Sequence, residues 1–325
     1  MTTHRASTRT DHGPVRAHGT RFLHEDGTPF HPLSTSVPQA DGRTLRSLRD
    51  TPFTKVRLLD PGLPLDRLDH QVAALGELGL QAEVMLRGRD IPETVTRLAG
   101  RPNVWWCAPA CHEAQTDIQE HDHGHRPLTV HGPPGTDFGA PWITHASVAH
   151  PQTRAVSGLV RDLRKPVLVD DCGAEGDDPG DPERALPGTE LLCRLWEAVC
   201  RGGYAGHAEA WGEEPWSDGG GRLSGTAVER VAFLREVLEA APTGLGHTPE
   251  TYDASTLEAS GEYVLQYLGP HRYPRRSFAL PGGVWSVEVL DTWNMTVREL
   301  DDAGGDRVTV ELPAEPYLAV RLRRR

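Results

Sequence analysis

Short apolar runs that recur along the N-terminal part of the chain constrain its fold more than any other feature. Each run closes on polar residues, and some are apolar at consecutive positions, as Val167, Leu168 and Val169 are. Consecutive apolar positions are typical of strands covered on both faces, as in a parallel sheet with helices outside. We predict eight such strands: Pro29–Val37, Phe53–Leu59, Gln81–Leu86, Asn103–Ala108, Leu128–His131, Trp142–Val148, Pro166–Val169 and Tyr204–Trp211.

Helical patterns lie between several of these strands. The clearest has an apolar stripe from Leu65 to Leu78 and ends at Gly79, and a second covers Thr189–Arg201. A third begins at Thr226, where Glu229 completes the spacing of a capping box. Alternating strands and helices predict an α/β fold, and eight strands predict a (β/α)8 TIM barrel.

After Pro242 the apolar pattern changes to period two, which is typical of antiparallel strands. The Asp- and Gly-rich segment 301–306 predicts a hairpin turn between two of these strands. We therefore expect the barrel at residues 20–242 and a small antiparallel β-sandwich domain at residues 243–325. Residues 1–19 are polar and lack periodicity, so we expect a mobile N-terminal arm there.

Charge and composition exclude several functional classes. The chain of 325 residues has 34 Lys and Arg against 46 Asp and Glu, a net charge of −12, which excludes a generally basic nucleic-acid binder. No apolar stretch is long enough to span a membrane or to act as a signal peptide, so we expect a cytoplasmic protein that does not bind membranes. The five cysteines suit reduced thiols better than a disulfide framework.

The run from Glu120 to His125 contains residue types that bind Zn²⁺ or Ni²⁺. Structural metal sites usually gather ligands from separate segments, and this run reads as a solvated loop before the fifth strand. We therefore expect no metal site and no cofactor. The sequence does not predict an oligomeric state.

Polar residues follow the predicted strands at their C-terminal ends, where the sites of TIM barrels lie. We call this end of the barrel the mouth. Carboxylates and imidazoles gathered there can exchange protons and bind hydroxyl groups, which indicates sugar chemistry. These residues are Ser36, Arg57, Asp60, Arg87, the stretch Cys111–His112–Glu113, His131, His145, Asp170, Asp171, His207 and Glu209.

Five tryptophans are candidates for stacking against sugar rings: Trp105, Trp106, Trp142, Trp211 and Trp216. Trp105 and Trp106 are adjacent in a strand and point in opposite directions, so at most one of them faces the mouth. Trp211 and Trp216 lie past the eighth strand and are the better candidates.

The segments PFTKVRL, RPNVWW, KPVLVDDCGAEGD and VEVLDTWNMTV occur in this order between residues 21 and 323. They resemble segments of apiosidase-like bacterial glycoside hydrolases. The resemblance implies a clan-A (β/α)8 barrel with a small C-terminal β domain, and hydrolysis of O-glycosidic bonds of an oligosaccharide or polysaccharide by a retaining mechanism. It implies an Asn-Glu acid/base pair at the end of the fourth strand and a Glu nucleophile at the end of the seventh.

The chain departs from this pattern at both positions. Ala110 and Cys111 stand where the family has Asn-Glu, and a carboxylate follows only at Glu113. Asp171 stands where the family has the nucleophilic Glu, so its carboxylate lies about one C–C bond, ~1.5 Å, further back. Retaining hydrolysis requires two carboxyl groups about 5 to 5.5 Å apart, so this difference matters.

We therefore predict a glycoside hydrolase-like protein whose activity is reduced or lost, with Asp171 as nucleophile and Glu113 or Glu209 as proton donor. Two alternatives stay open: a catalytically inactive barrel that binds carbohydrate, favoured by Ala110 and Cys111, and a scaffold for protein interactions. We assign to substrate binding Arg57, His131, His145, Asp170, His207, Trp211 and Trp216.

Overall fold

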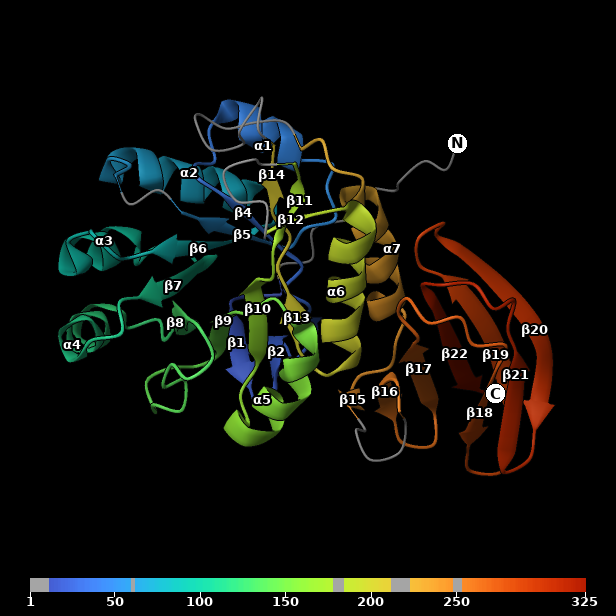
Figure 1. The fold of residues 1–325 in the computed structure, drawn as a ribbon. Helices are drawn as coiled ribbons and strands as arrows, with labels where there is room; N and C mark the ends of the chain where they lie inside the picture. The colour runs from blue at the N-terminus through green and yellow to red at the C-terminus, as the bar shows by residue number, and fades with distance from the viewer. Residues whose placement is uncertain (1–11, 60–61, 178–183, 212–222, 248–252) are drawn as a thin grey trace.

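A TIM barrel forms the larger part of the molecule (Figure 1). The computed structural model describes residues 12–59, 62–177, 184–211, 223–247 and 253–325. Eight parallel strands form one sheet in the order β13-β10-β9-β8-β7-β6-β5-β4. They are β4 Ser34–Val37, β5 Lys55–Leu58, β6 Gln81–Met85, β7 Val104–Ala108, β8 Leu128–Gly132, β9 Ala146–Ala149, β10 Val167–Asp171 and β13 Tyr204–Ala205. Each of the eight predicted segments overlaps one of these strands. The predicted strands Pro29–Val37 and Tyr204–Trp211 are too long, because their other parts, β3 Pro29–Phe30 and β14 Glu209–Ala210, belong to other sheets.

The sheet closes on itself through His207, two residues beyond β13. The His207 amide donates to the Ser34 carbonyl at 2.8 Å, and the Ser36 amide donates to the His207 carbonyl at 3.1 Å. Thr35 and His207 form the corresponding parallel bridge. Because the sheet is closed, neither β4 nor β13 is an edge strand. The C-terminal ends of all eight strands lie at one mouth of the barrel.

Helices cover the outside of the barrel. The predicted helices after Leu65, Thr189 and Thr226 are confirmed. The connection from β8 to β9, residues 133–145, is fully described and contains no helix, so the alternation is incomplete there. The α-helices of the described residues are α1 Gly42–Leu48, α2 Leu65–Glu77, α3 Ile91–Leu98, α4 His112–His121, α5 Val156–Leu163, α6 Gly188–Cys200 and α7 Ala227–Glu239.

The N-terminal segment forms a small sheet at the N-terminal end of the barrel. Its strands are β1 Val15–His18, β2 Arg21–His24 and β3 Pro29–Phe30. Phe22 lies 4.7 Å from the Trp105 ring and 5.3 Å from His145, between ring centroids. The mobile arm predicted for residues 1–19 is therefore wrong for residues 15–18, which pair with β2; residues 1–11 lie outside the described residues.

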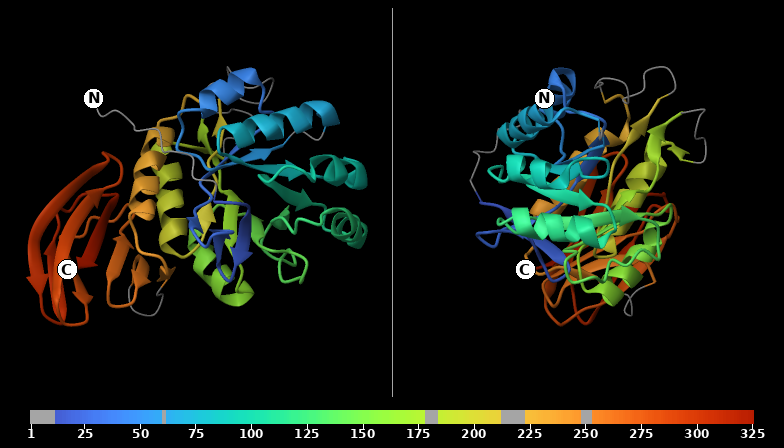
Figure 2. Two further views of the ribbon diagram at one scale, coloured as in Figure 1. Left: turned by 180° about the vertical axis from the view of Figure 1, so that it is seen from behind. Right: turned by 90° about the vertical axis from the view of Figure 1, so that its left-hand side faces the viewer.

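Two antiparallel sheets follow the barrel and pack on each other (Figure 2). One has the order β15-β16-β17-β22-β19-β20 and the other pairs β18 with β21, and an apolar cluster that includes Phe278, Trp285 and Val320 fills the space between them. The strands are β15 Gly246–His247, β16 Ser255–Ala259, β17 Tyr263–Tyr267, β18 Arg275–Ala279, β19 Val284–Asp291, β20 Thr296–Gly304, β21 Arg307–Glu311 and β22 Leu318–Arg324. The predicted β-sandwich is confirmed.

The hairpin predicted at residues 301–306 is wrong. β20 pairs with β19, whereas β21 pairs with β18. The segment therefore carries the chain from one sheet to the other, which the local turn signal does not distinguish from a hairpin.

The sandwich rests on the barrel through α6. Tyr263, Leu265 and Tyr267 of β17 belong to the same apolar cluster as Trp196 of α6. Trp196 and Tyr267 stack, with ring centroids 5.6 Å apart. Because α6 packs on the barrel on one side and on the sandwich on the other, nine of its residues are buried. No helix in the described part of the chain is both long and apolar enough to cross a membrane.

Candidate functional site

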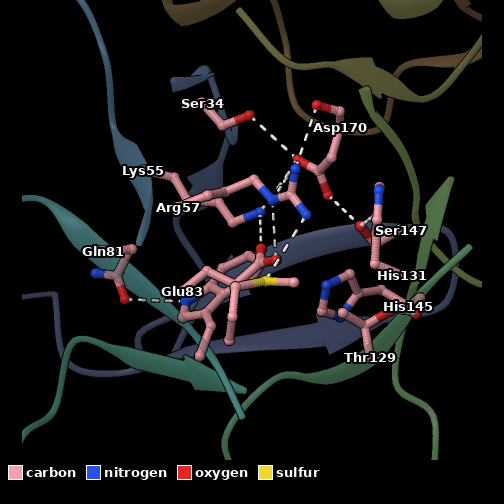
Figure 3. Close-up of polar contacts among 12 residues, drawn as sticks. Ser34, Lys55, Arg57, Gln81, Glu83, Thr129, His131, His145, Ser147 and Asp170 are labelled. Carbon is pink, nitrogen blue, oxygen red and sulfur yellow. Dashed lines mark hydrogen bonds and ion pairs between the residues drawn. The ribbon is translucent and has the colours of Figure 1, made fainter. Parts of the chain in front are cut away.

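A cluster of four charged side chains fills the barrel interior below the mouth (Figure 3). Lys55 and Arg57 project from β5, Glu83 from β6 and Asp170 from β10. Arg57 Nε donates to Glu83 Oε1 at 3.1 Å, Lys55 forms an ion pair with Glu83, and Lys55 Nζ lies 3.4 Å from Asp170 Oδ1. All four side chains are at most 4% exposed, so two positive and two negative charges compensate one another away from water.

The pKa values of this cluster are set by opposing effects. Burial alone would raise the pKa of Glu83 and of Asp170, but Lys55 and Arg57 outweigh burial and hold both pKa values below the usual range. Conversely, Asp170 and Glu83 outweigh the burial of Arg57 and raise its pKa. Both carboxyl groups are therefore ionised at neutral pH, and breaking any of these pairs would leave a buried charge without compensation.

Asp170 is also the end point of a chain of hydrogen bonds from the mouth. Ser147 Oγ of β9 donates to Asp170 Oδ2 at 2.6 Å, and His131 Nδ1 of β8 lies 2.9 Å from Ser147 Oγ. Ser34 Oγ donates to Asp170 Oδ1 at 3.3 Å. Of the three linked residues, His131 is the partly exposed one, so the chain connects the buried cluster with the mouth.

Asp171, the predicted nucleophile, lies at the end of β10 with a side chain that is 29% exposed. Its carboxylate is 2.5 Å from the guanidinium of Arg184, and its carbonyl accepts a hydrogen bond from the His150 amide. The carboxylate of the adjacent residue, Asp170, points into the barrel. The two neighbouring aspartates therefore occupy different environments.

Glu113, the first predicted proton donor, lies in the first turn of α4 and is exposed. Cys111 precedes this helix as its N-cap and is exposed too. Between β7 and Glu113 the chain supplies Pro109, Ala110, Cys111 and His112, so no carboxylate stands directly at the end of β7.

Glu209, the second predicted proton donor, is buried in β14 (Glu209–Ala210) and accepts three hydrogen bonds. The donors are Trp211 Nε1 at 2.9 Å, the Ser224 amide at 2.8 Å and the Gly225 amide at 3.0 Å. Burial raises the pKa of Glu209 although these donors act in the opposite direction. Glu209 thus connects Trp211 with Ser224 and Gly225, which lie on either side of residues 212–222 in the sequence.

Glu175, in β11 (Ala174–Gly176), lies beside Glu209 and holds the start of α7. It accepts hydrogen bonds from the Thr226 amide, the Thr226 hydroxyl and the Ala227 amide. The capping box predicted for Thr226 and Glu229 is not formed, because Thr226 makes no side-chain cap bond within α7. The carboxylate of Glu175, from β11, takes the place of the capping box at the N-terminal end of α7, where the helix dipole is positive.

His145 and His207 are fully buried, although both are predicted substrate ligands. His145 packs against Phe22 and Trp105, and His207 lies 4.9 Å from the Phe53 ring centroid with Nδ1 2.9 Å from Thr35 Oγ1. Burial lowers the pKa of each to about 3, so both are neutral at pH 7.

The tryptophan candidates separate into three groups. Trp105 and Trp106 are both completely buried, the first within the barrel and the second under α4, where its Nε1 donates to Asp122. Trp142 and Trp211 are partly exposed. Trp216, like Asp60, lies outside the described residues.

Within the run from Glu120 to His125, Asp122 has a structural role. This buried carboxylate accepts hydrogen bonds from Trp106 Nε1, from the Gly124 amide and from the Arg126 amide. The described residues contain no group of three His, Cys, Asp or Glu side chains arranged to hold a metal ion.

Sequence reasoning missed Lys55, Glu83, Ser34 and Ser147. A usable signal was present for the first two: Lys55 and Arg57 alternate with apolar residues in KVRL, as Glu83 does in AEVM. Charges at period two within apolar strands indicate that several strands direct charges to one interior, where they must compensate each other.

Two surface hollows of about 400 and 420 Å³ are lined by other parts of the molecule, one by β19, β20 and β22 and the other by α2, α3 and α4. Neither involves a candidate site residue. Among the candidate residues at or beyond the C-terminal strand ends, His131, Asp171 and Trp211 are partly exposed.

Solved structures with similar folds are glycoside hydrolases by their descriptions. One is described as "a putative glycoside hydrolase" from Bacteroides vulgatus, with 24% identity and a TM-score of 0.83 over 97% of this chain and 83% of the other. A second, described as a glycoside hydrolase, has 14% identity and a TM-score of 0.77 over 97% of both chains. A third, a family 5 glycoside hydrolase from Bacteroides vulgatus, has 12% identity and a TM-score of 0.76 over 97% of this chain and 94% of the other.

Residues 252–323 match a domain of unknown function, DUF5605. No curated protein matches the chain. The similarity to the three solved structures establishes a glycoside hydrolase-like fold for the chain.

Proposed function

We propose that this protein binds carbohydrate at the barrel mouth and that its capacity for retaining hydrolysis is strongly reduced or lost. The proposal rests on the glycoside hydrolase-like fold together with the altered pair of carboxylates. Under this proposal the protein is an apiosidase-like barrel that has lost catalytic groups. The ligand of its mouth is then a carbohydrate, as in the active enzymes.

The state of the three candidate carboxylates carries the proposal. Asp171 is paired with Arg184, Glu113 is exposed on α4, and Glu209 has three hydrogen-bond donors. A retaining mechanism needs one carboxylate free to attack and another able to give and take a proton at about 5 to 5.5 Å. The ion pair of Asp171, the exposure of Glu113 and the hydrogen bonds to Glu209 each count against these roles and support the proposal.

A second candidate function is residual hydrolysis, in which Asp171 is the nucleophile and Glu113 or Glu209 the proton donor. The position of Asp171 at the end of β10 favours it, because this is where the resemblance puts the nucleophile. Arg184 would then have to release Asp171 when substrate binds.

The test is glycan binding by the full chain on an array of plant and microbial oligosaccharides. We expect binding of at least one glycan class, and weaker binding by Trp211→Ala, which removes the partly exposed aromatic ring beside the mouth. Asp162→Asn is the matched control, because Asp162 is an exposed carboxylate on α5 that pairs with the neighbouring Arg161. A protein that binds no glycan on the array would refute the proposal.

A further inference from the structure

The chain of hydrogen bonds from Asp170 to His131 determines where the protons lie. Asp170 is ionised, so its carboxylate can only accept hydrogen bonds. Ser147 has a single hydroxyl proton and donates it to Asp170 Oδ2 over 2.6 Å. Ser147 Oγ can therefore only accept from His131 Nδ1, 2.9 Å away, and Nδ1 must carry a proton.

The opposite nitrogen of His131 is left for solvent or a ligand. The Nε2 atoms of His145 and His207 are buried without hydrogen-bond partners, whereas His131 is partly exposed and its Nε2 is not one of the buried, unpartnered atoms of the described residues. In a neutral imidazole with Nδ1 protonated, Nε2 has a lone pair and no proton.

The charges around His131 favour this neutral form. Burial, followed by the positive charge of Arg57, lowers the pKa of His131, while the carboxylates of Asp170, Glu83 and Asp171 act in the opposite direction. The net effect is a pKa below the usual value for histidine, so the ring is neutral at pH 7.

We propose that His131 is a fixed hydrogen-bond acceptor that selects ligands with a hydroxyl donor at this point of the mouth, and that Ser147 and Asp170 are positioning residues that set its tautomer. The ligand part rests on the proposed carbohydrate-binding function. A sugar hydroxyl satisfies Nε2 by donating to it, whereas a ligand group that only accepts hydrogen bonds leaves Nε2 unpaired and is disfavoured.

The tautomer can be measured without any ligand. In a full chain labelled with ¹⁵N-histidine, long-range ¹H–¹⁵N spectra at pH 7 distinguish protonated from unprotonated ring nitrogens, and His131→Gln identifies the signals of His131. We expect a protonated Nδ1 and an unprotonated Nε2. A protonated Nε2, or a mixture of tautomers in the wild-type protein, would overturn the proposal.

Two serine variants distinguish the chain of hydrogen bonds through Ser147 from general effects on Asp170. Ser147→Ala removes the acceptor for Nδ1 and should shift His131 towards the Nε2-protonated tautomer. Ser34→Ala removes the other serine bond to Asp170, of 3.3 Å, and should leave the tautomer unchanged. An unchanged tautomer in folded Ser147→Ala would refute the positioning role; the wild-type spectrum tests the tautomer even if this variant does not fold.

Binding of methyl pyranosides tests the ligand part. We expect His131→Gln to weaken binding about tenfold, the effect of one lost hydrogen bond, and wild-type binding to weaken as acidic pH protonates Nε2. Equal affinity of His131→Gln and wild type would overturn the selective role of His131 and leave the proposed function intact. A wild-type protein that binds no methyl pyranoside but binds a glycan on the array would overturn the ligand part alone. Binding to neither would overturn the proposed function as well, and the spectra would still decide the tautomer.

Discussion

The carboxylate of Asp171 lies 2.5 Å from the guanidinium of Arg184, so the acidic group at the end of β10 is already paired in the free protein. Its neighbour Asp170 points the other way, into a buried cluster with Lys55. Two consecutive aspartates thus serve different purposes, one partly exposed at the mouth and the other inside the barrel.

We expect the ion pair at the mouth to contribute little to stability. The Arg184 side chain is 53% exposed, and exposed ion pairs typically contribute at most about 1 kcal/mol. Arg184→Ala should therefore change the free energy of unfolding in urea by less than about 1 kcal/mol. A loss of several kcal/mol would show that Arg184 has a structural role instead.

The buried cluster should behave in the opposite way. Lys55→Met leaves Glu83 and Asp170 with Arg57 as the one remaining cation of the cluster, and removing one partner of a buried pair typically costs about 3 to 5 kcal/mol. Urea unfolding should show a loss in this range, whereas Arg97→Met, which breaks exposed pairs with Asp66 and Asp69, should have a much smaller effect. Similar losses in both variants would contradict the compensating role of the cluster.

Stability should fall as the pH falls from 7 to 5, partly because of His145 and His207. Each has a folded-state pKa of about 3, below the unfolded value near 6.5, so the unfolded state binds more protons in this range. Their contribution is present above the unfolded pKa and is lost as the pH falls, by about 2 kcal/mol per residue at pH 5. His145→Gln cannot titrate and should give a shallower dependence of unfolding free energy on pH; an unchanged dependence would mean that His145 becomes charged in the folded protein.

Glu209→Gln should lower the stability of the folded protein. The carboxylate accepts three hydrogen bonds, and an amide has only one oxygen to accept them, so we expect a loss of about 1 to 3 kcal/mol in urea unfolding. Glu113→Gln is the control, because Glu113 is exposed and should leave stability unchanged within about 0.5 kcal/mol. If Glu209→Gln is as stable as the control, its hydrogen bonds do not hold the chain in place.

Much of the fold could be predicted because it depends on local patterns. Consecutive apolar residues such as Val167 to Val169 mark strands covered on both faces, and eight such runs leave few alternatives to a barrel. The hairpin at residues 301–306 failed because a turn signal says nothing about which sheet the next strand joins. The strand at residues 15–18 was missed because only Val15 is strongly buried in it.

The sequence predicts which candidate residues stand at strand ends, but not the surroundings of their side chains. His131 and Asp171 are partly exposed near the ends of β8 and β10, whereas Arg57 lies in the buried cluster; their predicted roles stay predictions. Whether an imidazole at a strand end faces the mouth or the core depends on neighbouring strands, and His145 and His207 turned out to be buried. The partners of Glu209 come from Ser224 and Gly225, across a segment whose path the sequence does not determine.

Restoring the family pattern should increase hydrolysis. A variant that combines Ala110→Asn, Cys111→Glu and Asp171→Glu supplies an acid/base residue at the end of β7 and extends the carboxylate of residue 171 by about 1.5 Å. We expect this variant to release aryl alcohol from aryl glycosides faster than wild type. No gain would indicate that the loops of this mouth, rather than the carboxylates, prevent turnover.

The central claim is that the wild-type mouth lacks a working pair of carboxylates. Its most direct test is the rate of aryl glycoside hydrolysis by wild type and by Asp171→Ala, measured side by side at neutral pH. We predict that the two rates are equal and close to that of buffer alone. Rapid hydrolysis by wild type that Asp171→Ala abolishes would contradict the claim and identify the protein as an active glycosidase.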